Sequence, residues 1–331
     1  MNFMIKSKAV RNPYFELLRG FAIMMVVGIH TYKLGDDFSL FVRQILNCAV
    51  PLFLACSGFF MAKKDVSDRG KHIAFLKKQI PKVYMPCLIW SVPYLVISLC
   101  NGGSVLKGVV NLLLCGFSVY YFIILIIQYY VLLPYYQRIN KRYMILNIAV
   151  SLISVGVLTF LFNFKAMNIQ LVLYAGWFTL WTMFFAVGVL LGKNSKRDYK
   201  LLPYWIITIL GLILSFVESK YLIGISRGGI GIKASSFIYS FGIIMLLFSE
   251  KAERFFQIRN IVDRFIHFVG KISFGIYLIH CLIILIFVKN MPEIWLAIPW
   301  ILRMIIILLC SIIVIKIVKP ISKKLSSWIG F

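Results

Sequence analysis

The fold is decided by the sequence YFELLRGFAIMMVVGIHTYK at residues 14–33. A helix of about 20 residues rises about 1.5 Å per residue, which is enough to cross the roughly 30 Å of hydrocarbon in a bilayer. The run contains Glu16, Arg19 and His30, and no small-residue cleavage pattern follows it. We therefore interpret it as a retained first membrane span, not as a signal peptide.

Nine further apolar runs follow the first. The chain is 61% hydrophobic and 14% charged, well below the quarter of charged residues that is usual for a soluble globule. These observations predict an all-α, polytopic integral membrane protein of about ten transmembrane helices, with one membrane-embedded domain over residues 1–331. The further runs are 44–62, 83–100, 118–137, 143–163, 174–192, 201–219, 234–249, which is somewhat short, 265–288 and 295–318.

The basic residues indicate the orientation of the spans. The net charge of +25 would suit a nucleic-acid-binding protein, but the positions of the charges argue against that class. If the loops alternate between the two sides, 25 of the 36 Lys and Arg residues fall on one side and 8 on the other, with Arg19, Lys271 and Arg303 inside spans. This asymmetry follows the positive-inside rule and predicts that both termini are cytoplasmic.

The first span carries the strongest candidate for a functional site. Arg19 and His30 are eleven residues apart, so they project from one helix face, about 16 Å apart along the axis. Ionisable residues inside a span generally mark a site or a pathway. Two other interpretations remain open: Arg19 snorkels to the surface, paired with Glu16 one turn earlier, and His30 is an interfacial histidine with a satisfied hydrogen bond.

The ninth span carries a second polar stripe. Ser273, Tyr277 and His280 are four and seven residues apart, which places them on one side of a helix. His280 is expected at about the depth of His30, in the half of the membrane opposite Arg19. A structural role for His280, with its ring hydrogen-bonded across helices, is the alternative.

Two other features give weaker predictions. The seven cysteines show no metal-ligand spacing, so no metal site is predicted, and a disulfide between Cys100 and Cys115 is one open pairing. The basic loop from Lys63 to Lys82 includes apolar residues near helical spacing. It predicts a short amphipathic helix on the membrane surface.

Three motifs together resemble acyltransferase family 3. They are the Arg-x(10)-His pattern of Arg19 and His30, the run VPLFLACSGF at residues 50–59, and SFGIYLIH at residues 273–280. Members of this family are integral-membrane enzymes that O-acylate extracytoplasmic polysaccharides and related cell-surface molecules in bacteria. Many members have an acidic residue at the start of the second span, where this chain reads Ala-Val-Pro at residues 49–51, so that carboxylate is absent or supplied elsewhere.

The resemblance implies a mechanism and its substrates. It implies acetyl-CoA or another acyl-CoA as cytoplasmic donor, with no permanently bound cofactor, and a glycan or glycolipid acceptor at the bacterial inner membrane. Arg19 and Lys82 would bind the CoA phosphates, and His30 would be the general base on the acceptor hydroxyl. Tyr277 or protonated His280 would stabilise the oxyanion.

Three further residues are included as secondary candidates. They are Glu16, Ser273 and Ser57, and Ser57 beside Gly58 is interpreted as a close-packing position between helices. No serine lies in a nucleophile-elbow context, which favours direct transfer over an acyl-serine intermediate. The competing functions are a polysaccharide exporter or flippase of the same fold and a membrane scaffold in which the Arg and His only register helices.

Overall fold

The secondary structure is helical throughout the part of the chain that can be described. A computed structural model describes residues 12–33, 35–165, 169–194, 196–225, 231–320 and 328–331. Within these ranges there is no strand, and the all-α prediction is confirmed. The N-terminal basic residues Lys6, Lys8 and Arg11, on which part of the orientation prediction rests, lie outside the described residues.

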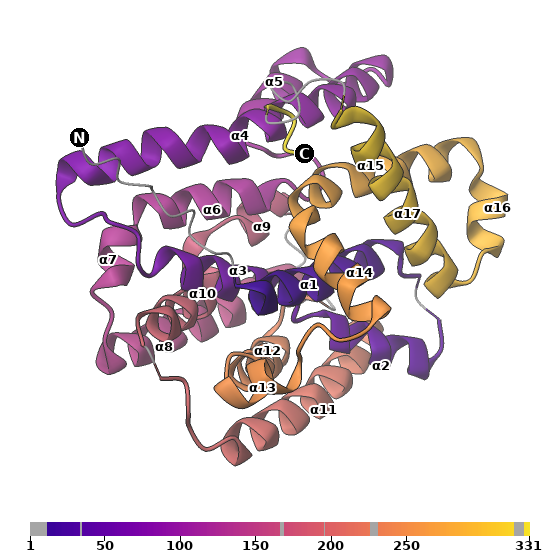
Figure 1. Ribbon diagram of the computed structural model, residues 1–331. Helices are drawn as coiled ribbons and strands as arrows, with labels where there is room; N and C mark the ends of the chain where they lie inside the picture. Colours follow the sequence, from indigo (N-terminus) through magenta and orange to yellow (C-terminus); the bar gives the residue numbers. More distant parts are fainter. Residues whose placement is uncertain (1–11, 34, 166–168, 195, 226–230, 321–327) are drawn as a thin grey trace.

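The helices are numbered in chain order in Figure 1. They are α1 (Pro13–Thr31), α2 (Asp37–Leu46), α3 (Ala49–Met61), α4 (Arg69–Cys100), α5 (Val105–Leu113), α6 (Tyr121–Val131), α7 (Leu133–Gln137), α8 (Lys141–Thr159), the π-helix η1 (Phe160–Phe164), α9 (Leu171–Ala175), α10 (Phe178–Lys193), α11 (Leu202–Ile225), α12 (Ala234–Leu247), α13 (Glu250–Phe255), α14 (Ile261–Lys271), α15 (Ser273–Asn290), α16 (Pro292–Ala297) and α17 (Trp300–Val318).

Seven helical stretches of the described chain are long and apolar enough to cross a membrane. They are α1, α2 with α3, α4, α8 with η1, α11, α15 and α17. Three shorter apolar helices, α6, α10 and α12, occupy the other three predicted runs. The chain is therefore a multi-pass membrane protein, while the count of ten spans and the cytoplasmic position of both termini stay predictions.

Helices α6 and α10 are shorter than the apolar runs that contain them, for local reasons that a hydropathy pattern cannot detect. Pro134 at the start of α7 cannot donate a backbone hydrogen bond, and its ring crowds the carbonyl of Tyr130 four residues earlier, so α6 ends at Val131. Gly176 and Trp177 separate α9 from α10. Each of these two predicted runs therefore contains two helices instead of one.

The basic loop after α3 differs from the prediction. Residues from Arg69 onward do not form a separate surface helix but the first half of α4, which continues unbroken to Cys100 over 32 residues. Asp68 caps its start, with its side chain accepting a hydrogen bond from the Lys71 amide at 2.9 Å. The predicted amphipathic surface helix was therefore wrong: that segment extends the third span and carries its basic residues along one rigid helix.

Helix α1 lies at the centre of the molecule, against α3, α14, α15 and α17 (Figure 1). Its closest approach is to α14, where a Cβ on Gly20 would collide with the carbonyl of Ile266, and one on Gly270 with the carbonyl of Glu16. Van der Waals packing of small residues is a main source of helix association in lipid, where burial from water contributes little. These two glycines therefore fix the rotation of α1 and, with it, the direction of Arg19.

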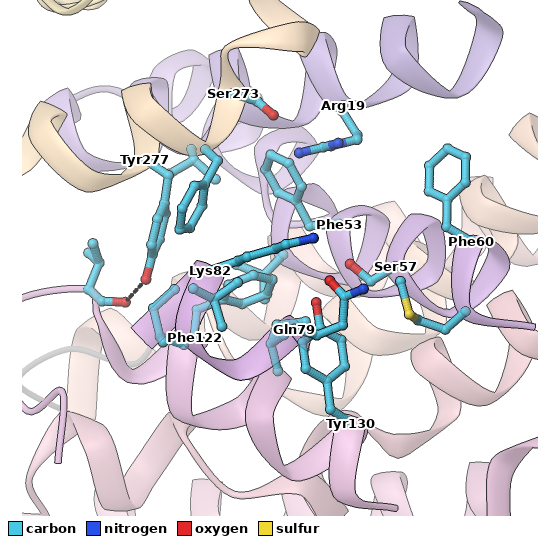
Figure 2. A pocket seen from close by; sticks show the side chains of 18 of the residues that line it. Arg19, Phe53, Ser57, Phe60, Gln79, Lys82, Phe122, Tyr130, Ser273 and Tyr277 are labelled. Carbon is cyan, nitrogen blue, oxygen red and sulfur yellow. Dashed lines mark hydrogen bonds between the residues drawn. The ribbon is translucent and has the colours of Figure 1, made fainter. Parts of the chain in front are cut away.

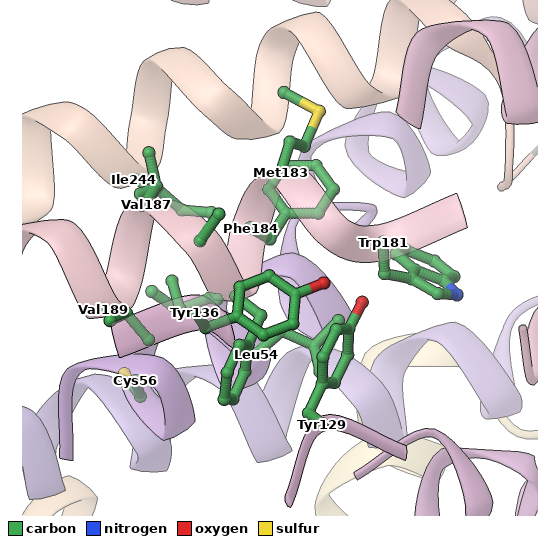
Figure 3. Close-up of a cluster of buried hydrophobic side chains, with 14 of the residues drawn as sticks. Leu54, Cys56, Tyr129, Tyr136, Trp181, Met183, Phe184, Val187, Val189 and Ile244 are labelled. Atoms are coloured by element: carbon green, nitrogen blue, oxygen red, sulfur yellow. The ribbon is translucent and has the colours of Figure 1, made fainter. Parts of the chain in front are cut away.

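A second close contact joins α3 to α10. A Cβ on Gly58 would collide with the Phe185 carbonyl, and one on Gly188 with the Ala55 carbonyl. Beside this contact lies a cluster of buried side chains that includes Tyr129 and Tyr136 (Figure 3). Tyr129 also stacks on Phe185, with ring centroids 4.3 Å apart. The close contact at Gly58 and Gly188 fixes the position of α3, which lines the cavity described below.

Buried polar groups between α2, α11 and α12 satisfy one another. Lys233 is completely buried, and its ammonium donates to Gln44 Oε1 at 2.7 Å, Ser215 Oγ at 2.8 Å and Ser236 Oγ at 2.8 Å. A charged group at membrane depth is tolerated when it is hydrogen-bonded in this way. The cluster fixes α2 against the α11–α12 pair.

All seven cysteines are free thiols. Cys100 is exposed at the end of α4, whereas Cys115 is fully buried after α5 in a cluster that also contains Cys87. The pairing of Cys100 with Cys115 is therefore contradicted, because the chain turns Cys115 back into the protein interior.

Candidate active site

A cavity of about 760 Å³ runs along α1 between α3, α4, α6 and α15. On α1 its lining extends from Glu16 to His30, a separation of 14 residue positions and therefore about 21 Å of helix. Its volume is within the range of sites that hold cofactor-sized ligands. Figure 2 shows side chains from several of these helices converging on the cavity.

One end of the cavity is cationic and is called here the Arg19 end. Arg19, Lys82, Lys63 and Lys64 line the cavity together with Gln79. Arg19 is half-buried because Gly20, the next residue, faces α14, so the guanidinium turns toward the cavity instead (Figure 2). Several cationic side chains thus line the same part of the cavity, which suits a polyanionic ligand.

The other end is called the His30 end and is mostly apolar. His30 lies in the last turn of α1 and is exposed to the cavity. Val26, one turn earlier, and Phe53, Phe122 and Val119 from other elements line the cavity with it. An imidazole among apolar side chains is a suitable proton acceptor for a reaction that must exclude bulk water.

His280 lies directly behind His30. The two ring centroids are 5.4 Å apart, and His280 is completely buried. Its Nδ1 lies 2.8 Å from the Tyr277 carbonyl oxygen and 3.0 Å from that of Ile276. Because carbonyl oxygens only accept, Nδ1 carries the proton, and the lone pair of Nε2 faces the Cys281 sulfur at 3.2 Å. The structure thus brings together the two histidines that were expected at the same depth.

Tyr277 lines the cavity, but its hydroxyl already has a partner. The O–H donates to the Val119 carbonyl at 2.7 Å (Figure 2), in the irregular segment between α5 and α6. Irregular backbone inside a membrane protein requires such donors because lipid offers none. In this arrangement Tyr277 stabilises the segment that lines the cavity. To donate to an oxyanion, its hydroxyl would first have to break its hydrogen bond with the Val119 carbonyl.

Glu16 is held by a residue to which sequence analysis assigned no role. It is buried, and its carboxylate lies 2.9 Å from Nε2 of His267 on α14. The close contact of Gly20 and Gly270 brings these two side chains together. Glu16 therefore links α1 to α14 at the edge of the Arg19 end, where it also lines the cavity.

The two candidate serines both line the cavity. Ser273 is almost completely buried, its hydroxyl has no hydrogen-bond partner among the described residues, and it is directed toward the Arg19 side (Figure 2). Ser57 is half-buried, and the close packing against α10 is made by its neighbour Gly58. One residue along a helix turns the side chain by about 100°, so Ser57 faces the cavity while Gly58 makes the contact with α10, and the interpretation of Ser57 as a packing position stays a prediction.

Sequence reasoning missed several cavity residues. Lys63, Lys64 and Gln79 line the Arg19 end, and Tyr121 lines the cavity from the start of α6. The available signal was the density of basic residues between the second and third spans. That density could not select among the basic residues, because the choice depends on how the long α4 packs against α6 and α15.

Comparison with known protein families matches residues 12–318 to the acyltransferase domain of acyltransferase family 3. The chain belongs to acyltransferase family 3. It is also 26% identical over 276 residues to the Bacillus subtilis (strain 168) protein named "Putative membrane-bound acyltransferase YfiQ", a match that covers 76% of this chain and 73% of that protein. No solved structure matches the chain. The resemblance predicted from the three motifs is thereby confirmed, and the protein is a membrane acyltransferase.

Proposed function

We propose that this acyltransferase moves an acyl group, expected to be acetyl, from cytoplasmic acyl-CoA to a hydroxyl of an envelope polysaccharide or its lipid-linked precursor. The observation that carries the proposal is one cavity with cations at its Arg19 end and an imidazole at its His30 end, about 16 Å apart along α1. A donor with a polyanionic head and a long apolar arm fits this arrangement. The proposed location is the bacterial inner membrane, with the Arg19 end toward the cytoplasm.

The first step is binding of the donor. Arg19 offers a planar fork for two phosphate oxygens, and Lys82, Lys63 and Lys64 add point charges beside it. The pantetheine arm then extends between α1 and α6 toward His30. Burial of that arm against Phe53 and Phe122 excludes water from the thioester.

The second step is direct transfer. His30 removes the proton of the acceptor hydroxyl while the oxygen forms a bond to the thioester carbonyl carbon. The tetrahedral intermediate collapses with cleavage of the C–S bond, and the CoA thiolate takes the proton back from His30. The products are an ester on the acceptor and free CoA thiol, so atoms and charges balance without another reactant.

His280 and Tyr277 support this step in different ways. The His280 ring lies 5.4 Å from the His30 ring, and its Nε2 would share the positive charge that develops on a protonated His30 once it turns from Cys281. Tyr277 would donate to the oxyanion after its hydroxyl releases the Val119 carbonyl. Ser273, whose buried hydroxyl has no hydrogen-bond partner among the described residues, would bind a polar group of the donor arm.

The test compares the surface polysaccharide of strains that carry the wild-type protein, Arg19→Ala or His30→Ala. We expect both variants to lose O-acyl groups while the glycan still reaches the surface in normal amount. A mass spectrum of the glycan measures the acyl group and its acceptor together, and immunoblotting of membranes controls for expression. Loss of the glycan from the surface would overturn the proposal in favour of an exporter, and unchanged acylation in both variants would favour a scaffold.

A further inference from the structure

Three potential metal ligands meet at the His30 end. One ring nitrogen each of His30 and His280 and the sulfur of Cys281 all lie within 4.8 Å of one another. The His280 Nε2 to Cys281 Sγ distance is 3.2 Å. Ligands bound about 2.0–2.3 Å from a tetrahedral ion stand about 3.5 Å apart, so a movement of the His30 ring on the order of 1 Å completes the set.

The surroundings of His280 are those of a metal ligand. Its Nδ1–H is fixed by two backbone carbonyls, of Ile276 and Tyr277, which leaves Nε2 as the lone-pair nitrogen on the side of Cys281. Metal-binding histidines almost always have their second nitrogen held by a carbonyl or carboxylate in this way. The ring therefore needs neither a tautomer change nor a rotamer change to bind a metal.

We propose that His30, His280 and Cys281 form a binding site for Zn²⁺ or a similar borderline divalent ion. Two imidazoles and a thiolate suit Zn²⁺ and Co²⁺ and do not suit the oxygen-seeking Mg²⁺ or Ca²⁺. Cys281 releases its thiol proton to solvent on binding. His30 lines the cavity, so the fourth position of the ion is reached from the same space as the substrates.

Binding of the metal ion is expected to inhibit acyl transfer. This expectation, unlike the binding site itself, rests on the proposed function. The lone pair of His30 that would take the acceptor proton is the one that the ion occupies. A bound ion therefore competes with the base step, and a chelator restores activity. The sequence alone did not predict the site, since adjacent His280 and Cys281 have no metal spacing and the third ligand comes from α1.

Binding is tested on the purified full chain in detergent by titration with Co²⁺, followed by its visible d–d bands and thiolate charge-transfer band. We expect one equivalent to bind with tetrahedral absorption in the wild type. Cys281→Ser should lose the thiolate band and weaken binding at least tenfold. Cys310→Ser, which removes a half-buried cysteine on α17, is the matched control and should keep both. Identical spectra for the wild type and Cys281→Ser would overturn the proposal.

Inhibition is tested separately, so that its failure can be told from failure of the proposed function. Each variant's CoA release from acetyl-CoA is measured with and without Zn²⁺ and is expressed relative to its own metal-free rate. We expect inhibition of the wild type and of Cys310→Ser that EDTA reverses, and at least tenfold weaker inhibition of Cys281→Ser. Co²⁺ bound by the three ligands without inhibition would leave the site intact and refute the base role of His30. If Zn²⁺ does not change the activity and the Co²⁺ bands are absent, the metal site is refuted and the proposed function is not affected.

Discussion

The two ends of the cavity differ in the number and chemistry of their polar side chains. The Arg19 end gathers several cations from different segments: Arg19 is on α1, Lys82 is exposed on α4, and Lys64 lies in the connection between α3 and α4. The His30 end has a pair of imidazoles, of which His30 is exposed to the cavity, whereas His280 is buried and held by backbone carbonyls. Redundant charges tolerate imprecise placement, whereas a proton transfer does not. We therefore expect donor binding to be shared among many residues at the Arg19 end and the chemical step to depend on few residues at the His30 end.

The largest effect is expected from His30→Ala. Loss of a general base generally costs about 10²–10⁴-fold in rate. We expect kcat to fall by that amount while the affinity for CoA, measured by calorimetry on the purified protein, stays within about twofold. His72→Ala is the control, because His72 contacts the Tyr130 carbonyl and lies outside the cavity lining. A large loss of CoA affinity in His30→Ala would break the division between the two ends.

Arg19→Ala should produce the opposite pattern. Hydrogen bonds to a charged partner are worth about 1.5–3 kcal/mol, which corresponds to about 10–100-fold in KM for the donor. Arg19→Lys should recover part of this loss because it keeps the charge but not the planar fork. Steady-state kinetics with varied acetyl-CoA measure both variants. Should kcat fall with KM unchanged, Arg19 acts at the chemical step and the comparison fails.

Lys82→Ala should have a smaller effect that depends on salt. An exposed charge contributes about 0.2–1 kcal/mol, which is up to about fivefold in KM. The difference from the wild type should shrink as ionic strength rises, because salt screens exposed charges. Lys78→Ala is the matched control, since Lys78 is exposed one turn earlier on α4 and lies outside the cavity lining. Equal effects of the two substitutions would indicate general surface charge instead of a specific contact.

Ser273→Ala should have the smallest effect. The hydroxyl makes no hydrogen bond within the described protein, so its removal should not lower the melting temperature. If it meets the donor arm, KM should rise by about 2–5-fold, the value of one neutral hydrogen bond. Thermal unfolding and donor KM measured on the same preparation separate the two. A lowered melting temperature with unchanged KM would assign Ser273 to packing.

Much of the fold could be predicted from the sequence because lipid imposes a length on every apolar helix. Hydropathy placed the apolar runs, but it could not detect that α6 ends before Pro134 or that Gly176 separates α9 from α10, since both breaks lie inside apolar sequence. It also treated residues from Arg69 onward as a surface loop because they are charged. In the structure the helix simply continues outward along α4.

The candidate site was predictable where it lies on one helix and not where it depends on packing. The spacing of Arg19 and His30 placed both on one face, and both line one cavity. The pairing of Glu16 with His267 depends on the close approach of Gly20 and Gly270, which no single-helix pattern reveals. Likewise, the backbone carbonyls that hold His280 are its own helix's, but its meeting with His30 depends on how α1 crosses α15.

The most direct test is a cryo-electron microscopy structure of the protein with a non-hydrolysable acyl-CoA analogue. We expect the phosphates of the analogue to contact Arg19 and Lys82, and its carbonyl carbon to lie within about 4 Å of an imidazole nitrogen of His30. A nucleotide bound at the His30 end, or an acyl arm that lies outside the cavity, would contradict it.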